Sequence, residues 1–443
     1  MGIIPPINPL FYLFLFLAFL LFVLALNILL RSKRARWVKV LFFGCACLLL
    51  IVTIAYPIQL YSNKSTPLAS SVVLIGYASP SHIVALNARD GSVRWTQPID
   101  NQTYLSGGSG NLVYTVSKAS DGTGVVTAYA TSNGRQVWRD SLPLLQNDQQ
   151  DSVAFSDLLV SDGLVYVDET LRSSNVVYAL HTNDGSLVWK HVGQTTDDQE
   201  PFLITAGNGL LLVQTQDSGF SAWHASDGSL AWHFSPEGGF IHTYQQVLAN
   251  QAVYFLQDTA LASPNGHSSL IALSQSNGKV LWQDQLPGSN AAEISVSKLA
   301  VAGTHLYLHS YDLTLLNAFN GTQIWQDAGS RFAATTKGPP TGLDGSAPTE
   351  VNGIVYVPRS GALNALDARN GRLLWRLPAD PDGNFTTPVS YQNVLFTSAN
   401  AIPPFRYQAG SGQDAVVAID PSNGSVYWST TNAGSFVGIY NLF

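Results

Sequence analysis

The side chains that could carry chemistry in this 443-residue chain are scattered, and their spacing decides what each could do. Asp380, Asp382 and Asn384 alternate along one segment, as Ca²⁺ ligands can. No Glu follows at the distance that an EF-type loop requires, so we interpret the segment as a polar turn. His305 and His309 are four residues apart, which puts both on one side of a strand without a further zinc ligand nearby. We therefore predict no metal site and no catalytic residue.

Cysteine and charge content narrow the possible partners. Cys45 and Cys47 are the only cysteines, and both lie in an apolar run, so the rest of the chain has neither disulfides nor a Cys-based metal site. Residues 1–57 contain five bases and no acid, which leaves 17 bases against 29 acids, a net charge of −12, in residues 58–443. Such an acidic domain repels a phosphate backbone, and nucleic acid is excluded as a partner.

Two apolar runs near the N-terminus, about residues 9–30 and 37–57, are each long enough to cross a bilayer as an α-helix. A cleaved signal peptide would need bases before its apolar stretch, and a buried hairpin would need a polar face. The basic segment 31–36 between the runs is predicted to be a cytoplasmic loop. We therefore predict a cell-membrane protein with two spans, a tether over 58–70 and an extracytoplasmic domain over 71–443.

Eight segments of eleven residues repeat along that domain. Each ends in Trp, has Gly at its seventh place and has Asp or Asn directly before the Gly, and seven of the eight begin with Ala. The eight glycines are Gly91, Gly134, Gly185, Gly228, Gly278, Gly321, Gly371 and Gly424. The eight tryptophans are Trp95, Trp138, Trp189, Trp232, Trp282, Trp325, Trp375 and Trp428.

The residue types of the repeat have a direct physical interpretation. Asp-Gly and Asn-Gly pairs tolerate the positive φ angles of a two-residue hairpin turn, so each segment is predicted to be a strand, a tight turn and a strand. The final Trp offers a large flat surface for packing against a neighbouring repeat, and the small Ala leaves room for it. We therefore interpret the repeated Gly and Trp as structural residues.

A further apolar run with strand character precedes each hairpin, and residues such as 202–205 can add an inner strand. Trp-to-Trp intervals of 43 to 53 residues suit a four-stranded propeller blade. The sequence therefore predicts an all-β fold, an eight-bladed β-propeller with four-stranded antiparallel blades, preceded by the pair of transmembrane α-helices. Only the tether precedes Val72, so we expect residues 435–440 to supply the inner strand of blade one and close the ring.

The eleven-residue segments resemble the tryptophan-docking repeat of the PQQ-like (quinoprotein alcohol dehydrogenase-like) β-propeller family, which has Ala, Gly and Trp at the same places. The resemblance covers about residues 72–440. The family usually has Thr before the Gly, where this chain has Asp or Asn, a change that preserves a turn. The chain is also similar to the repeat proteins related to BamB, the propeller subunit of the outer-membrane barrel assembly machinery.

The resemblance implies two alternative functions. Cofactor-using members hold pyrroloquinoline quinone (PQQ) between a Trp floor and a ring of two adjacent cysteines, beside a Ca²⁺ ion. The adjacent cysteines are missing here. The BamB-related members imply a non-catalytic protein-binding or scaffold module that contacts another envelope protein and needs no cofactor. We take this scaffold as the first hypothesis, with a membrane-bound PQQ-dependent dehydrogenase oxidising an alcohol or sugar as the alternative.

Strand connectivity predicts where a partner would bind. In an up-and-down blade, the turns between third and fourth strands share one side of the disc. The loops between second and third strands and the links between blades share the other side, and here they are long and varied, as recognition loops are. The candidate contact residues on that side are Asp197, Asp198, Glu200, Phe405, Arg406 and Tyr407. The alternative is that these loops are solvated and have no partner.

Overall fold

A computed structural model describes the strands of the domain and most of the short turns between them. The described residues are 72–76, 82–99, 103–109, 111–120, 122–143, 154–170, 174–194, 203–215, 219–236, 240–241, 246–258, 268–286, 297–310, 312–327, 346–359, 361–379, 384–399 and 415–430. All of them belong to the compact unit Ser70–Phe443. The predicted spans 9–30 and 37–57, the loop 31–36, the tether 58–70 and the closing strand 435–440 lie outside these ranges. Within these ranges, no helix is long and apolar enough to span a membrane.

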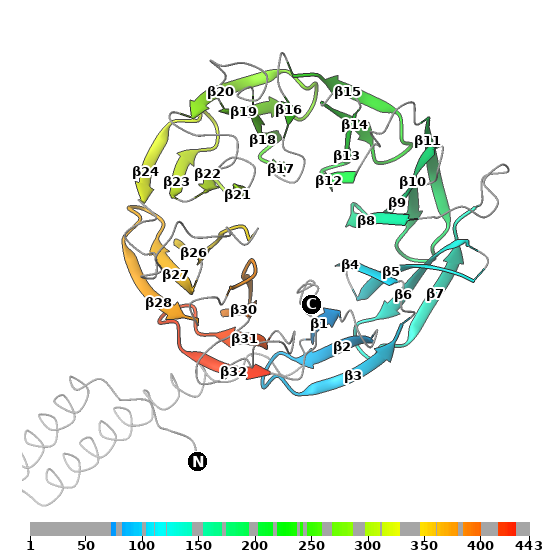
Figure 1. Cartoon of the computed structure of the whole chain (residues 1–443), viewed down its shortest axis with the longest axis horizontal. Helices are drawn as coiled ribbons and strands as arrows, with labels where there is room; N and C mark the ends of the chain where they lie inside the picture. Colours follow the sequence, from blue (N-terminus) through cyan, green and yellow to red (C-terminus); the bar gives the residue numbers. More distant parts are fainter. Residues whose placement is uncertain are drawn as a thin grey trace, which may run out of the picture. The chain divides into compact units, whose positions relative to one another are not determined.

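Eight antiparallel sheets follow one another around a ring, as Figure 1 shows, which confirms the predicted eight-bladed propeller. The first four blades are β1 (Val72–Gly76), β2 (His82–Asn87) and β3 (Val93–Pro98); β4 (Thr103–Ser109), β5 (Leu112–Lys118), β6 (Gly124–Ala130) and β7 (Gln136–Ser141); β8 (Ala154–Ser161), β9 (Leu164–Thr170), β10 (Ser174–His181) and β11 (Leu187–Gln194); β12 (Leu203–Gly207), β13 (Leu210–Gln214), β14 (Phe220–His224) and β15 (Leu230–Phe234).

The other four blades complete the ring. They are β16 (Phe240–Ile241), β17 (Val247–Ala249), β18 (Ala252–Asp258), β19 (Ser268–Ser274) and β20 (Val280–Leu286); β21 (Lys298–Ala302), β22 (His305–His309), β23 (Leu313–Asn317) and β24 (Gln323–Asp327); β25 (Thr349–Val351), β26 (Ile354–Arg359), β27 (Ala362–Asp367) and β28 (Leu373–Pro378); β29 (Val389–Tyr391), β30 (Val394–Ala399), β31 (Ala415–Ile419) and β32 (Val426–Thr430). Among the described residues, blade one has three strands, blade five has five because both β16 and β17 pair with β18, and the other six have four.

The hydrophobic core lies between neighbouring blades. The two middle strands of a blade are buried on both faces, so they form nearly continuous apolar runs, as in the fully buried β27. Side chains of alternating parity then face opposite neighbours. In blade three, Val165 and Val176 pack with blade two, whereas Tyr166 and Val177 pack with blade four. The fourth strand is the outer edge and alternates between burial and exposure, as in β28.

The Asp/Asn-Gly pair of the repeat does not form the two-residue turn that the sequence predicted. In blade one, the Asn87 N–H donates to the Ser92 carbonyl and the Gly91 N–H donates to the Asn87 carbonyl, both at 2.8 Å, so four residues separate the paired ends. Gly91 has a φ of +71°, whereas Asp90 does not enter the positive region. Instead, Asp90 Oδ1 accepts a hydrogen bond from the Ser92 N–H at 3.0 Å. The Asp or Asn is therefore needed for its side-chain acceptor, as in other Asx turns.

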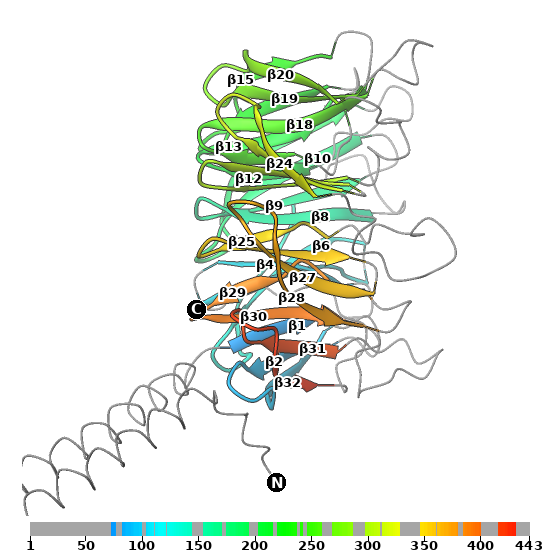
Figure 2. The same ribbon diagram turned by 90° about the vertical axis from the view of Figure 1, so that its left-hand side faces the viewer.

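Two-residue turns with positive φ occur between the first and second strands of blades. Asp162 and Gly163 have φ angles of +52° and +77°, and Asn208 and Gly209 have +55° and +78°. Because successive strands are antiparallel, these turns and the turns of the repeat lie on one side of the ring, which we call the turn face. The opposite side, where the loops between second and third strands and the links between blades begin and end, is the loop face. Figure 2 shows the ring from its side.

Candidate functional site

The repeated Trp residues join each blade to the next. In all eight cases the indole N–H donates to the backbone carbonyl of the fourth residue of the following repeat. The pairs are Trp95–Thr131 (2.9 Å), Trp138–Thr182 (2.9 Å), Trp189–Ala225 (2.8 Å), Trp232–Gln275 (2.7 Å), Trp282–Ala318 (3.0 Å), Trp325–Ala368 (2.8 Å), Trp375–Pro421 (3.0 Å) and Trp428–Ala88 (2.9 Å). The last pair joins blade eight to blade one, so the ring closes through described residues alone.

The repeated Gly residues lie directly under these indoles. A Cβ atom built on Gly134 would come within 2.5 Å of Cε3 of Trp95, a separation that side chains do not tolerate. The other seven repeat glycines face a Trp of the preceding blade in the same way. Gly is therefore required at this place for two reasons: its backbone has a positive φ, and the Trp indole approaches its Cα too closely for a side chain.

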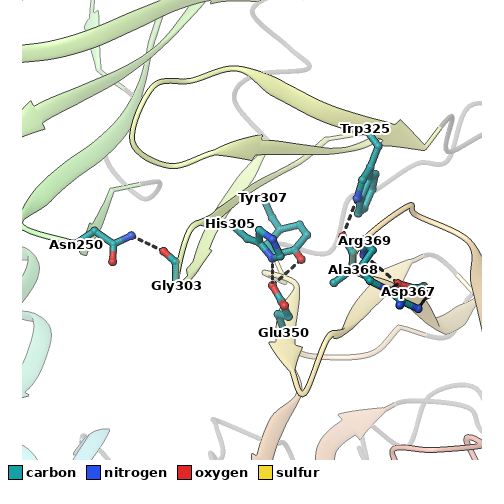
Figure 3. Close-up of polar contacts among 9 residues, drawn as sticks. All are labelled: Asn250, Gly303, His305, Tyr307, Trp325, Glu350, Asp367, Ala368 and Arg369. Carbon is teal, nitrogen blue, oxygen red and sulfur yellow. Dashed lines mark hydrogen bonds and ion pairs between the residues drawn. The ribbon is translucent and has the colours of Figure 1, made fainter.

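A polar seam lies between blades six and seven and brings several ionisable side chains together. Near the turn face, Tyr307 of β22 donates its hydroxyl hydrogen to Oε2 of Glu350 on β25 at 2.7 Å. Nδ1 of His305 lies 2.7 Å from the same oxygen. Figure 3 shows His305 and Tyr307 both pointing toward Glu350. A carboxylate oxygen only accepts, so the His305 tautomer facing it carries its proton on Nδ1.

The electrostatics of this contact keep the proton on the Tyr307 hydroxyl, so the contact serves to hold two blades together. Burial, followed by the hydrogen bond and the charge of Glu350, raises the pKa of Tyr307 far above its ordinary value of 10.0. Tyr307 therefore stays a neutral donor at any physiological pH. The side chains of His305 and Glu350 are only 28% and 12% exposed, so the pair ties two neighbouring blades together within the stack.

The seam continues toward the loop face. Nη2 of Arg359 on β26 bonds to Oδ2 of Asp327 at the end of β24 at 2.8 Å, and both side chains are almost fully buried. On the same side of β22 as His305, His309 is buried, with Nδ1 3.3 Å from the Ser346 carbonyl. Burial, and then the Arg359 charge, lowers the pKa of His309 to about 4. Asn364 is also fully buried, and neither polar atom of its amide has a hydrogen-bond partner.

The structure brings together some residues singled out in the sequence and leaves others undescribed. His305 and His309 do lie on one side of a strand, as their spacing predicted, and Glu350, Arg359 and Asp327 lie around them. These three could not be connected with the histidines from the sequence, since they belong to other strands and follow by 18 residues or more. The predicted contact residues, Asp197, Asp198, Glu200, Phe405, Arg406 and Tyr407, lie outside the described ranges, as do Asp380 and Asp382.

The donor set that a Ca²⁺-bound quinone would need is not assembled by the described part of the chain. Within it, three or more His, Cys, Asp or Glu side chains nowhere converge as metal ligands. Several of its shielded carboxylates are held by other groups: Glu350 by Tyr307 and His305, Asp327 by Arg359, and Glu169 by Tyr178. The described residues therefore do not fit the cofactor of the dehydrogenase alternative.

Comparisons with known proteins agree on one architecture. Outer membrane protein assembly factor BamB of Yersinia pestis is 22% identical over 331 residues, 72% of each chain. The protein of that name from Moranella endobia (strain PCIT) is 23% identical over 283 residues, 60% of this chain and 66% of the relative. Among solved structures, dihydro-heme d1 dehydrogenase NirN in complex with DHE superposes with a TM-score of 0.55 at 15% identity, over 85% of this chain and 76% of that one. At such identity the likeness shows the fold alone.

A family model described as outer membrane protein assembly factor BamB matches residues 79–207, 173–337 and 359–441. These matches include all eight repeated Trp and all eight repeated Gly and cover well over half of the chain. The repeats, the ring of eight blades and this match lead to one conclusion: the chain belongs to the PQQ-like β-propeller family of outer membrane protein assembly factor BamB.

Proposed function

We propose that this chain is a membrane-tethered, extracytoplasmic propeller that binds another envelope protein through its loop face and catalyses no reaction. The observation that carries the proposal is the family match over residues 79–337 and 359–441, because the matching family is named for assembly of an outer membrane protein. The relatives with that name are similar over most of this propeller. A scaffold is the class of role that such a match supports.

The construction of the ring supports a scaffold as well. Eight indole-to-carbonyl hydrogen bonds link consecutive blades into a closed circle, so each blade is held from both sides. In the polar seam, Tyr307 and Glu350 are joined by a hydrogen bond, and Tyr307 stays protonated. A rigid ring of this kind can present variable loops in a constant arrangement, which is how scaffolds commonly carry recognition sites.

Membrane attachment rests on the sequence. The apolar runs 9–30 and 37–57 and the basic segment 31–36 support two spans with a cytoplasmic connection, which would leave the propeller outside. Protease digestion of spheroplasts, whose outer envelope layers are removed and whose cytoplasmic membrane is intact, tests this orientation. The propeller should be cleaved in spheroplasts, and full protection until the cytoplasmic membrane is opened would contradict the proposed orientation.

Site-specific crosslinking tests the loop face. A photoreactive residue introduced at Asp198 or Arg406 of the full chain in its native membrane should crosslink to a defined envelope protein. The same residue introduced at Asn208, in a two-residue turn of the turn face, is the matched control and should not yield that product. Equal yields from both faces, or no product from the loop positions, would overturn binding through the loop face.

The dehydrogenase alternative has its own test. The full chain is mixed with PQQ and Ca²⁺, and the absorbance of bound PQQ and dye-linked oxidation of an alcohol or glucose are measured. We expect neither. Stoichiometric binding with turnover would establish the enzyme and overturn the scaffold.

A further inference from the structure

Blade one differs from the other blades on its inner side, which faces the axis of the ring. Among the described residues its sheet consists of β1, β2 and β3, whereas each of the other seven sheets has a further strand on the inner side. In blade two, β4 pairs with β5, and in blade three, β8 pairs with β9. No described strand pairs with the inner edge of β1, and Figure 1 shows β1 as the innermost described strand of its blade.

The register of β1 identifies it as the second strand of a blade. Val72, at its beginning, pairs with Asn87, the third residue of the repeat in blade one. Leu112, at the beginning of β5, pairs with Ala130, the third residue of the repeat in blade two. Therefore β1 corresponds to β5, and no described strand of blade one corresponds to β4.

A strand edge without a partner strand is a liability for a protein. Its N–H and C=O groups must be satisfied by water, or they attract a strand of another chain. A second consequence is mechanical, because β1 closely follows the predicted tether 58–70 and pairs with β2 on one side. A strand on the inner side would hold β1 at both edges and so fix the part of the propeller to which the tether is joined.

The last described strand ends at the place from which a chain can reach this edge. Strand β32 ends at Thr430 on the loop face, as β3 ends at Pro98. From Pro98, the four residues 99–102 lead to the inner strand β4 of the next blade. Blade one is the next blade after blade eight in the ring. Four residues after Thr430 can therefore reach the inner side of blade one, so that a strand can begin at Ser435.

Residues 435–440, Ser-Phe-Val-Gly-Ile-Tyr, have the composition of such a strand. Four of the six are aromatic or β-branched, which favours strands, and the segment contains neither a charge nor a Pro. An uncharged segment of this type is prone to pair with other chains when it is exposed. Pairing of this segment with β1 would therefore protect both the segment and the edge.

We propose that residues 435–440 pair with the inner edge of β1 in the same chain and complete blade one as its first strand. The pairing is antiparallel, because β1 starts on the turn face, where Val72 pairs with Asn87, and the segment follows Thr430 on the loop face. The ring is then closed twice, by this strand on the inner side of blade one and by the contact of Trp428 on the outer strand β32. The pairing does not depend on the membrane spans or on the loop-face partner of the proposed function.

Disulfide scanning on the full chain tests this pairing. The background carries Cys45→Ser and Cys47→Ser, because these are the only cysteines. Leu74→Cys, in the middle of β1, is combined in turn with a Cys at each position from 435 to 440. The matched control combines Ser226→Cys, an exposed position in the repeat turn of blade four, with the same six positions. Mild oxidation is followed by electrophoresis without reductant and by mass spectrometry of the linked peptides.

We expect disulfides within one chain, strongest at the position opposite Leu74 and weak at the two positions next to it. This pattern arises because successive residues of a strand point to opposite faces and a disulfide needs closely spaced Cβ atoms. The Ser226→Cys series should give a several-fold lower yield. A disulfide that joins two chains would overturn the proposal, because a second copy would then occupy the edge. Equal yields in the two series, or no product with Leu74→Cys, would overturn it as well.

Proline variants give a second measurement that needs no engineered Cys. Phe436→Pro and Val437→Pro each remove one N–H, and consecutive N–H groups of a strand point to opposite edges, so one of the two removes a hydrogen bond to β1. That variant should unfold at a clearly lower urea concentration than Ala433→Pro, which lies in the four-residue connection and is the matched control. Unfolding midpoints equal to the control in both variants would contradict the pairing.

Discussion

The indole N–H of Trp428 donates to the carbonyl oxygen of Ala88 at 2.9 Å, across 340 residues of sequence. The same indole lies against Gly91, where a Cβ atom would come within 2.5 Å of Cε3. This contact has the geometry of the seven contacts between blades that are consecutive in the chain. It is therefore a contact through which the described part of the last blade holds the first.

Removing this one hydrogen bond should weaken the closed ring. Trp428→Phe keeps an aromatic ring but leaves the Ala88 carbonyl without its donor, and we expect the free energy of unfolding to fall by about 1–2 kcal/mol. Urea denaturation followed by tryptophan fluorescence measures the change. Trp232→Phe, at a contact inside the chain order, is the matched control. A clear loss for Trp232→Phe with none for Trp428→Phe would show that the ring does not depend on this closure.

The two reasons for Gly in the repeat can be tested separately by comparing two glycines. Gly134 and Gly163 have φ angles of +69° and +77°, but only Gly134 lies under an indole, whereas a Cβ on Gly163 meets nothing within 4 Å. Gly163→Ala should lose about 1–2 kcal/mol of stability through its left-handed backbone alone. Gly134→Ala should lose clearly more, because Trp95 must also move. Equal losses in thermal or urea unfolding would show that the close approach contributes nothing.

Stability in acid should depend on the turns that carry Asp in place of Asn. The Ser two residues later donates hydrogen bonds from its hydroxyl and its backbone N–H, and these lower the pKa of Asp90, Asp184 and Asp227 below the ordinary value of 3.8. A carboxyl whose folded pKa is depressed stabilises the fold above its unfolded pKa, and this contribution disappears as the pH falls through the folded pKa. The triple Asp→Asn variant should therefore lose less stability between pH 4 and pH 2 than the wild type. The five turns with natural Asn show that the turn geometry tolerates the change. If the free energy of unfolding fell equally with pH in the variant and the wild type, the prediction would be wrong.

His309 should make the propeller sensitive to mild acid. Its pKa falls from 6.5 to about 4 because the ring is buried and lies near the Arg359 charge. The unfolded chain therefore takes up a proton more readily than the folded one, and stability present above pH 6.5 is lost as the pH falls toward 4. His309→Gln cannot titrate, so its free energy of unfolding should change less between pH 7 and pH 5 than that of the wild type. An unchanged pH dependence would show that His309 does not titrate as its surroundings imply.

Much of the fold could be predicted because the same eleven-residue segment occurs eight times, once in each blade. The apolar runs predicted before the eight hairpins are all strands, namely β1, β5, β9, β13, β18, β22, β26 and β30. The turn of the repeat was predicted wrongly as a two-residue turn. Asp-Gly and Asn-Gly pairs suit both turn types, and only the pairing of Asn87 with Ser92 distinguishes them. The true two-residue turn at Asp162-Gly163 has the same dipeptide and was overlooked.

Less of the candidate site could be predicted from the sequence. His305 and His309 were visible as a pair, but Glu350 is 45 residues from His305 and belongs to the next blade. The exposure of Phe319 was also hidden, because an apolar residue in a turn gives no sign in the sequence that it stays in solvent. The predicted contact residues of the loop face remain a prediction.

By itself, the sequence determined the number of blades, the order of their strands and the residues that join them. These follow from local spacing: an acceptor side chain, a Gly and a Trp at fixed places specify one turn and one contact wherever they occur. Only the tertiary structure decided which side chains meet between blades and which stay in solvent. That outcome depends on how neighbouring sheets stack, and the stacking placed Glu350 against His305 in the seam and left Phe319 outside it.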